Sequence, residues 1–264
     1  MLDRINDIIF FNRKIRNANL LNDEVILDGL EVYDVIRIIN KVPLFLEDHF
    51  NRLRTNTNHL GISLEIKQNE LKSLIDELIK ECNIINGNIK IVISFNKDKS
   101  RRNLMGYFIK TRYPKESDYQ FGVSLVSLLA DRRNPGIKLI NKELREISNK
   151  LIDESDAYEV LLINSDGYIT EGSRSNVFLI KDNEIFTSPI VDVLPGITRL
   201  NVIYICNKLG FKVTEKRIPF SELKNLDGVF ITGTSPKVLP VRKVDEFEFQ
   251  SESIILHKIM KEFD

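Results

Sequence analysis

The chain has 264 residues, of which 42% are hydrophobic, so it is long enough to bury a core as one large domain or two smaller ones. Lys and Arg number 38, as do Asp and Glu, and this balance argues against a nucleic-acid-binding protein. Two cysteines occur, Cys82 and Cys206, and their spacing suits neither a disulfide framework nor a zinc site, so no metal is expected.

The amino-terminal residues lack the basic and apolar segments of a secretory signal. No apolar run approaches the about 18 residues of a membrane span. We therefore expect a soluble, cytoplasmic protein with no membrane partner.

The first half of the chain predicts an α/β arrangement. Two runs rich in β-branched residues, 32–39 and 42–46, flank Asn40-Lys41 and predict a hairpin. A helix is expected next, because Glu47 and Asp48 suit a helix start and Gly61 suits its end. One further helix and two strands are expected at residues 71–79, 89–95 and 104–113.

A polar connector with a nearby proline, residues 115–120, separates a first domain, 1–114, from a second, 121–264. The second domain predicts mostly strands and hairpins, with turns at Asp166-Gly167 and Asp182-Asn183. Helices are expected at 143–154, at 197–209 before Gly210, and from about residue 253. The expected fold class is α+β.

One motif points to a site. It reads Glu171-Gly-Ser-Arg-Ser-Asn176-Val-Phe, then Thr187, then Leu194-Pro-Gly196-Ile-Thr-Arg199. This order and spacing resemble the signature of the class IV aminotransferases, the pyridoxal 5'-phosphate enzymes of fold type IV. That family includes branched-chain aminotransferases, D-amino acid aminotransferase and aminodeoxychorismate lyase. The resemblance implies a small α/β domain, a larger β-rich pseudo-barrel domain with helices, and a homodimer.

The chemistry implied by the resemblance needs an amine and a carboxylate. Ile137-Lys138-Leu139-Ile140-Asn141 resembles the family segment whose lysine forms a Schiff base with the cofactor, which makes Lys138 the catalytic candidate. Glu171 matches the carboxylate that keeps the pyridine nitrogen protonated. Two unit charges about 4 Å apart interact by roughly 4 kcal/mol at an effective dielectric near 20. This energy corresponds to about three units in the pKa of the pyridine nitrogen.

An anion site for the cofactor phosphate is expected at a helix start. Ile197 and Thr198 follow Gly196, where unpaired backbone N–H groups bind anions. The turn of small residues that contains Thr234 resembles the family's other phosphate-binding loop, and Thr234 is its expected contact. Arg52 matches a helix arginine that contacts the phosphate, and Arg132 or Arg133 would supplement it.

Substrate binding is expected at Tyr33 and Arg37, which alternation places on one face of a strand. Ser235 is a further candidate, and Arg101 or Arg102 is a weaker one. Many relatives carry Tyr directly after the asparagine that follows the lysine, whereas Lys142 follows Asn141 here. The partner of the cofactor's phenolic oxygen is therefore left open. Relatives also commonly have a Gly-rich run before the substrate aromatic residue, whereas Asp28-Gly29-Leu30-Glu31 is bulkier and acidic here, so a standard branched-chain substrate is not expected.

The resemblance implies an aminotransferase that moves an amino group between an amino acid and a 2-keto acid. An alternative with the same cofactor residues is aminodeoxychorismate lyase, which releases pyruvate and 4-aminobenzoate. A more remote alternative is a non-catalytic relative that binds the cofactor. Nicotinamide and nucleotide enzymes are disfavoured, because neither a Gly-x-Gly-x-x-Gly nor a phosphate-loop lysine motif is present.

Overall fold

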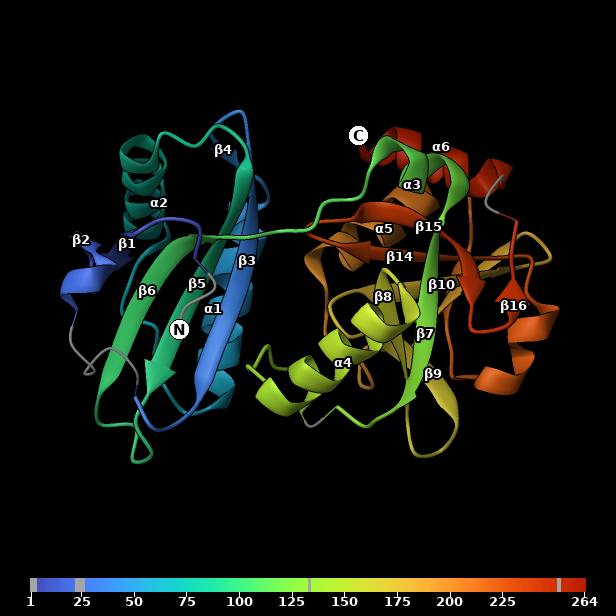
Figure 1. Cartoon of the computed structure of the whole chain (residues 1–264), viewed down its shortest axis with the longest axis horizontal. Coiled ribbons are helices and arrows are strands. Elements are labelled where there is room, and N and C mark those ends of the chain that lie inside the picture. Colours follow the sequence, from blue (N-terminus) through green and yellow to red (C-terminus); the bar gives the residue numbers. More distant parts are fainter. Residues whose placement is uncertain (1–3, 22–26, 133, 251–252) are drawn as a thin grey trace. The chain divides into compact units, whose positions relative to one another are not determined.

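The computed structural model describes residues 4–21, 27–132, 134–250 and 253–264 (Figure 1). The chain divides into two compact units. The first comprises the chain up to Arg112 together with Ile137–Ile140, and the second comprises Tyr113–Gly136 and Asn141–Asp264. The short segment that carries Lys138 therefore packs with the first unit, although the residues on both sides of it belong to the second.

The first unit is an antiparallel sheet with helices on one face (Figure 1). Its strands follow the order β2-β1-β6-β5-β3-β4. The strands are β1 (Ile8–Phe11), β2 (Lys14–Asn17), β3 (Glu31–Ile39), β4 (Val42–Pro43), β5 (Gly87–Phe95) and β6 (Arg102–Ile109). The helices are η1 (Ala18–Leu20), α1 (Leu46–His59) and α2 (Gln68–Cys82).

Side-chain alternation along β3 gives this sheet two different faces. Val32 and Ile36 pack with apolar residues of α1 and α2 in one core. Tyr33 packs on the opposite side with Val92 and Tyr107 in a separate cluster. We call the side that carries Tyr33, Val92 and Tyr107 the outer face, because α1 and α2 cover the other one.

The second unit is built on a ring of strands. An additional pairing of β10 with β9 closes β10, β14, β15, β7, β8 and β9 into a barrel. The strands are β7 (Val123–Leu129), β8 (Glu159–Ile163), β9 (Tyr168–Gly172), β10 (Asn176–Lys181), β11 (Glu184–Thr187), β12 (Val213–Glu215), β13 (Ile218–Pro219), β14 (Gly228–Gly233), β15 (Lys237–Val244) and β16 (Phe247–Glu248). The helices are α3 (Glu116–Phe121), α4 (Lys142–Ser155), α5 (Ile197–Lys208), η3 (Phe220–Asn225) and α6 (Ile254–Phe263).

Alternation along β10 and β14 also separates two apolar cores. Val177 and Ile231 belong to one cluster shared by the strands of the ring. Phe178 and Phe230 point the other way, stack with ring centroids 4.9 Å apart, and pack with residues of α5 and α6. The pair that closes the barrel consists of Glu171 and Asn176, so the motif lies on the seam of the ring.

These observations confirm the α+β fold class with a strand barrel, and also the expected main helices and hairpins. The hairpin of β1 and β2 was not expected; its turn residues Asn12 and Arg13 have φ of 45° and 70° without a glycine. The strand expected over 104–113 ends at Ile109, where its pairing with β5 stops. Most of the expected connector, 115–120, forms α3.

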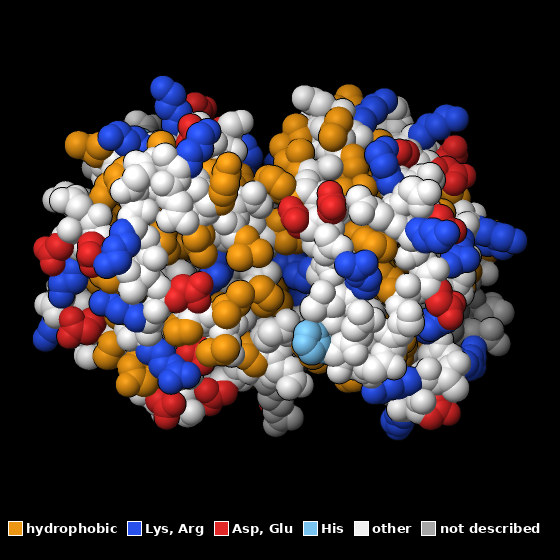
Figure 2. All heavy atoms as spheres, turned by 180° about the vertical axis from the view of Figure 1, so that it is seen from behind, with side chains coloured by type: hydrophobic (Ala, Val, Ile, Leu, Met, Phe, Trp, Pro, Cys, Tyr) orange, Lys and Arg blue, Asp and Glu red, His pale blue; other side chains and the backbone are white. Residues whose placement is uncertain are grey.

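The charged side chains do not segregate on the face seen in Figure 2, where acidic and basic groups are interspersed. In the described part of the chain, no helix is both long and apolar enough to cross a membrane. The same residues contain no cluster of three or more His, Cys, Asp or Glu side chains that could hold a metal ion.

Candidate active site

Lys138 lies on a short segment that extends the sheet of the first unit. The Tyr33 N–H donates to the Lys138 carbonyl (3.0 Å), the Ile140 N–H donates to the Glu31 carbonyl (3.1 Å), and Val32 forms an antiparallel bridge with Leu139. Leu139 packs against the helix-side core, whereas Ile140 packs against the outer-face cluster. Alternation therefore places Lys138 on the outer face, and its Nζ lies 4.9 Å from the centroid of the Tyr33 ring.

Both predicted substrate residues also lie on this face. Tyr33 is 9% exposed and Arg37 is half-buried four residues along β3, opposite Asn88 of β5. Strand alternation puts their side chains on the same side as Lys138. The first unit thus brings together the predicted amine, an aromatic ring and a guanidinium.

Arg52 projects from α1 onto the helix-covered face, where it meets a residue that the sequence did not single out. Its Nε donates to Asp34 Oδ2 (2.9 Å) and its Nη2 donates to Asp34 Oδ1 (2.6 Å). His49 Nδ1 lies 2.9 Å from the same Oδ1. Asp34 is fully buried and the Arg52 side chain is 9% exposed, so this pair fixes the orientation of the guanidinium.

Burial and charge act in opposite directions on this group. Burial of the Asp34 carboxyl raises its pKa, but the positive charge and hydrogen bonds of Arg52 outweigh burial and hold the pKa well below the ordinary range. Burial lowers the pKa of His49, and this outweighs the opposing effect of Asp34. His49 is therefore neutral near pH 7, and its Nδ1 carries the proton because the Asp34 carboxylate can only accept.

Glu171 lies at the seam of the barrel and is 1% exposed. Its Oε1 accepts from Arg132 Nη1 (2.8 Å), and its Oε2 accepts from the Leu194 N–H (3.0 Å) and from Asn176 Nδ2 (3.3 Å). Donors on both oxygens satisfy this buried carboxyl group and fix its orientation. Arg133, named with Arg132 as a supplementary phosphate ligand, lies outside the described residues.

The start of α5 is held against this carboxylate by Asn176. Asn176 Nδ2 also donates to the Leu194 carbonyl (2.9 Å). A Cβ added at Gly196 would lie 2.0 Å from Asn176 Oδ1, so any larger residue there must displace the Asn176 side chain. Gly196 is the N-cap of α5 and gives it no side-chain cap, which leaves the backbone N–H groups of Ile197 and Thr198 without helical acceptors.

A second group of small polar residues adjoins the seam. Thr232 of β14 pairs with Asn176 of β10, and its Oγ1 is buried without a hydrogen-bond partner among the described residues. Thr234 and Ser235 follow in the turn between β14 and β15. A buried hydroxyl without a partner beside an uncapped helix start fits a ligand that supplies acceptor atoms.

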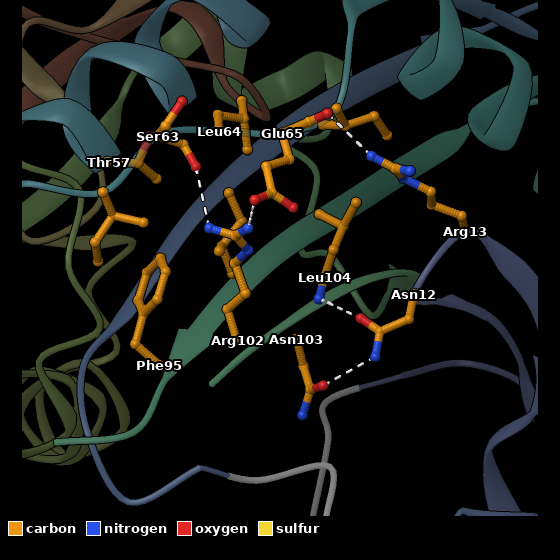
Figure 3. Close-up of a pocket in the computed structure, with 13 residues that line it drawn as sticks. Asn12, Arg13, Thr57, Ser63, Leu64, Glu65, Phe95, Arg102, Asn103 and Leu104 are labelled. Atoms are coloured by element: carbon orange, nitrogen blue, oxygen red, sulfur yellow. Dashed lines mark hydrogen bonds and ion pairs between the residues drawn. The ribbon is translucent and has the colours of Figure 1, made fainter. Parts of the chain in front are cut away.

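A cavity of about 210 Å³ in the first unit lies apart from the outer face (Figure 3). Arg102, a weaker candidate for substrate binding, lines it and pairs with Glu65 while Nη1 donates to the Ser63 carbonyl (3.4 Å). Arg13 Nη2 donates to the Glu65 carbonyl (2.9 Å). These contacts fasten the connection between α1 and α2 to β6 and to the β1–β2 turn.

The structure thus groups the predicted residues unit by unit. The first unit holds Lys138, Tyr33 and Arg37 on the outer face and Arg52 on the other face; the second holds Glu171, Ile197, Thr198, Thr234 and Ser235 around or near the barrel seam. Asp34 was not among the predicted site residues. The sequence feature that marks it is an acidic residue at a core position of the alternating run 32–39.

The sequence is similar to those of known enzymes. The sequence model of the family described as Amino-transferase class IV matches residues 31–244. A D-alanine aminotransferase from Bacillus licheniformis is 33% identical over 228 residues, which cover 82% of this chain and 80% of that protein.

Two solved structures illustrate the fold. A Legionella pneumophila protein that carries the provisional name 4-amino-4-deoxychorismate lyase has a TM-score of 0.80 and 26% identity, covering 88% of this chain and 90% of its own. A branched-chain amino acid aminotransferase from Escherichia coli has a TM-score of 0.82 and 21% identity, covering 98% of this chain and 93% of its own.

Proposed function

The chain belongs to the class IV aminotransferases, enzymes that move an amino group between an amino acid and a 2-keto acid, and from this premise we propose pyridoxal 5'-phosphate as its cofactor and Lys138 as the lysine that carries it. The observation that supports this best is the set of polar contacts around Glu171 at the barrel seam. There, Glu171 accepts from Arg132 (2.8 Å) and from the Leu194 N–H (3.0 Å), and Leu194 lies just before the uncapped start of α5.

Two sets of residues would hold the cofactor. Glu171, which is fixed in orientation by the donors around it, would keep a proton on the pyridine nitrogen. The N–H groups of Ile197 and Thr198 and the hydroxyl of Thr234 would bind the phosphate, with Arg52 as a charged ligand oriented by Asp34.

When bound, the cofactor supplies an electron sink that makes the substrate α-carbon acidic. Lys138 Nζ would then take the proton from that carbon and return it to the other reacting carbon. Tyr33 and Arg37, on the same face as Lys138, would orient the substrate, with Arg37 binding a carboxylate. Ser235 would add a hydrogen bond to the substrate.

The same residues suit a second activity, aminodeoxychorismate lyase. The likeness to the Legionella pneumophila protein favours keeping it. In that reaction the chain would expel pyruvate and leave 4-aminobenzoate. A non-catalytic protein that only binds the cofactor is the remaining alternative.

One spectroscopic experiment separates these three. The enzyme loaded with pyridoxal 5'-phosphate is mixed with single amino acids of both chiralities, and the visible absorbance is followed. An aminotransferase converts the cofactor to its amine form, and a 2-keto acid restores the starting spectrum. If no donor changes the spectrum and aminodeoxychorismate is consumed instead, the chain is a lyase; if neither happens, it is non-catalytic.

We also infer a homodimer that works in the cytoplasm. Leu200 and Tyr204 lie one turn apart on α5 and are 48% and 68% exposed, and Val191 nearby in sequence is 70% exposed. Exposed apolar groups of this kind are typical of surfaces that a second subunit covers. Light scattering of the purified chain would measure the subunit number.

Both cysteines are free thiols, as is usual in cytosolic proteins, and this supports a cytoplasmic location.

A further inference from the structure

Glu159, the first residue of β8, is a buried acid that the proposed function leaves unused. Its side chain belongs to a residue that is 3% exposed. Alternation places it on the same side of β8 as Leu161, which packs with the apolar residues of the ring. An acid in such surroundings costs free energy unless hydrogen bonds satisfy it, so its partners indicate what it does.

Both oxygens of Glu159 accept hydrogen bonds, and most of the donors lie in the turn between β9 and β10. Oε1 accepts from the Val160 N–H (2.8 Å) and from Ser173 Oγ (2.6 Å). Oε2 accepts from the Arg174 N–H (3.1 Å) and from Ser175 Oγ (3.3 Å). All but one of these donors belong to the turn, so the carboxyl group fastens the turn to the start of β8.

The backbone of this turn is held in the same place. The Gly172 N–H donates to the Ser175 carbonyl (2.8 Å), and the Ser173 N–H donates to the Val160 carbonyl (2.9 Å). A Cβ added at Gly172 would lie 2.0 Å from Ser175 Oγ and 3.2 Å from Glu159 Cγ. The turn is therefore packed directly against the Glu159 side chain.

The turn joins the two residues that close the barrel, Glu171 and Asn176. The Glu171 carboxyl group accepts from Asn176 Nδ2 (3.3 Å) and from the Leu194 N–H (3.0 Å). These donors act on the side chain of Glu171, whereas Glu159 acts on the backbone next to it. Orientation matters at such a place, because a displacement of about 1 Å at a reacting centre can cost roughly a hundredfold in rate.

Stability alone does not account for an acid at this position. Replacing buried charged groups by apolar side chains of similar volume often leaves the free energy of unfolding unchanged or raises it. What a carboxyl group adds is direction, because its two oxygens can accept from several donors at once and fix them relative to one another.

We propose that Glu159 is a positioning residue, which holds the turn 173–175 and thereby directs the Glu171 carboxyl group at the pyridine nitrogen of the cofactor. This inference rests on the proposed function, because it takes Glu171 to be the partner of that nitrogen. Glu159 thus controls the protonation of the cofactor through the turn.

The test is the titration of the pyridine nitrogen in the protein loaded with isotopically labelled pyridoxal 5'-phosphate, followed by nitrogen NMR. In Glu159→Gln, the side-chain NH2 group must face a backbone N–H whichever way the amide is turned, because each oxygen of Glu159 accepts from one. The pKa of the pyridine nitrogen should therefore fall by about one pH unit or more. Ser173→Ala, which removes one hydroxyl, should lower this pKa by a smaller amount.

Three further variants show whether the effect passes through the turn. Glu159→Gln and Ser173→Ala disturb the same hydrogen bond, so the double variant should lower the pKa by less than the sum of the two separate effects. Val244→Ala removes volume from the apolar cluster of the ring, and it should lower the free energy of unfolding without changing this pKa. Glu184→Gln, at an exposed acid on β11, is the matched control and should change neither quantity.

The proposal is overturned if the pyridine nitrogen of Glu159→Gln titrates as in the unchanged protein, or if Val244→Ala lowers its pKa equally. Circular dichroism verifies that each variant is folded. If Glu159→Gln does not fold, Ser173→Ala decides alone, and an unchanged pKa in that variant refutes the proposal.

Glu171→Gln separates this result from a failure of the proposed function. If Glu171→Gln leaves the pKa of the pyridine nitrogen unchanged, Glu171 is not its partner, and both the proposed role of Glu171 and the present inference are wrong. If Glu171→Gln lowers the pKa and Glu159→Gln does not, only the positioning role of Glu159 is wrong.

Discussion

Replacing Gly196 by Ala tests how the helix start is built. The backbone at Gly196 has φ −67° and ψ 135°, which alanine adopts without strain, so the expected effect is steric. The new Cβ would lie 2.0 Å from Asn176 Oδ1 and must displace that side chain. Asn176 then loses its hydrogen bonds to the Leu194 carbonyl (2.9 Å) and to Glu171 (3.3 Å).

Because a buried hydrogen-bonding group left unsatisfied costs about 1–3 kcal/mol, we expect the free energy of unfolding to fall by about 2–4 kcal/mol. Urea denaturation of the cofactor-free chain measures this change. Gly136→Ala is the matched control, since an added Cβ there meets nothing within 4 Å. If the Gly196 variant is as stable as the Gly136 variant, the tight contact with Asn176 is refuted.

Two further predictions concern protonation and charge. Because burial lowers the pKa of His49, the unfolded chain binds this proton at a higher pH than the folded chain does. Stability should therefore fall as the pH drops below about 6.5, by up to about 1.4 kcal/mol per pH unit, until the pKa of the folded state is reached. Urea midpoints should show this slope reduced in His49→Asn and retained in His59→Asn; equal slopes in both would contradict it. Glu171→Gln removes the carboxylate that we propose to face the cofactor nitrogen, and kcat should fall by about two to three orders of magnitude in steady-state assays. A decrease of less than about threefold would exclude this role.

Local signals predicted much of the fold. The hydrophobic alternation of 32–39 and the turn Asn40-Lys41 gave the hairpin of β3 and β4. Gly196 and Gly210 bracketed α5, where Gly210 has φ 79°. The β1–β2 hairpin escaped prediction because Arg13 occupies a left-handed position that usually favours glycine or asparagine.

The sequence pattern did not predict contacts between residues that are far apart in the chain. Asp34 was visible as an acid within a buried strand, but pattern alone did not identify its partners Arg52 and His49 on α1. The closure of the barrel between Glu171 and Asn176 depends on the ring as a whole.

The most direct test of the proposed chemistry is the absorbance of the purified protein after addition of pyridoxal 5'-phosphate and gel filtration. We expect the unchanged chain to retain cofactor with a visible absorption band. Lys138→Ala should lose that band, and Lys142→Ala, at the start of α4, should keep it. An unchanged band in Lys138→Ala would contradict the assignment of this lysine.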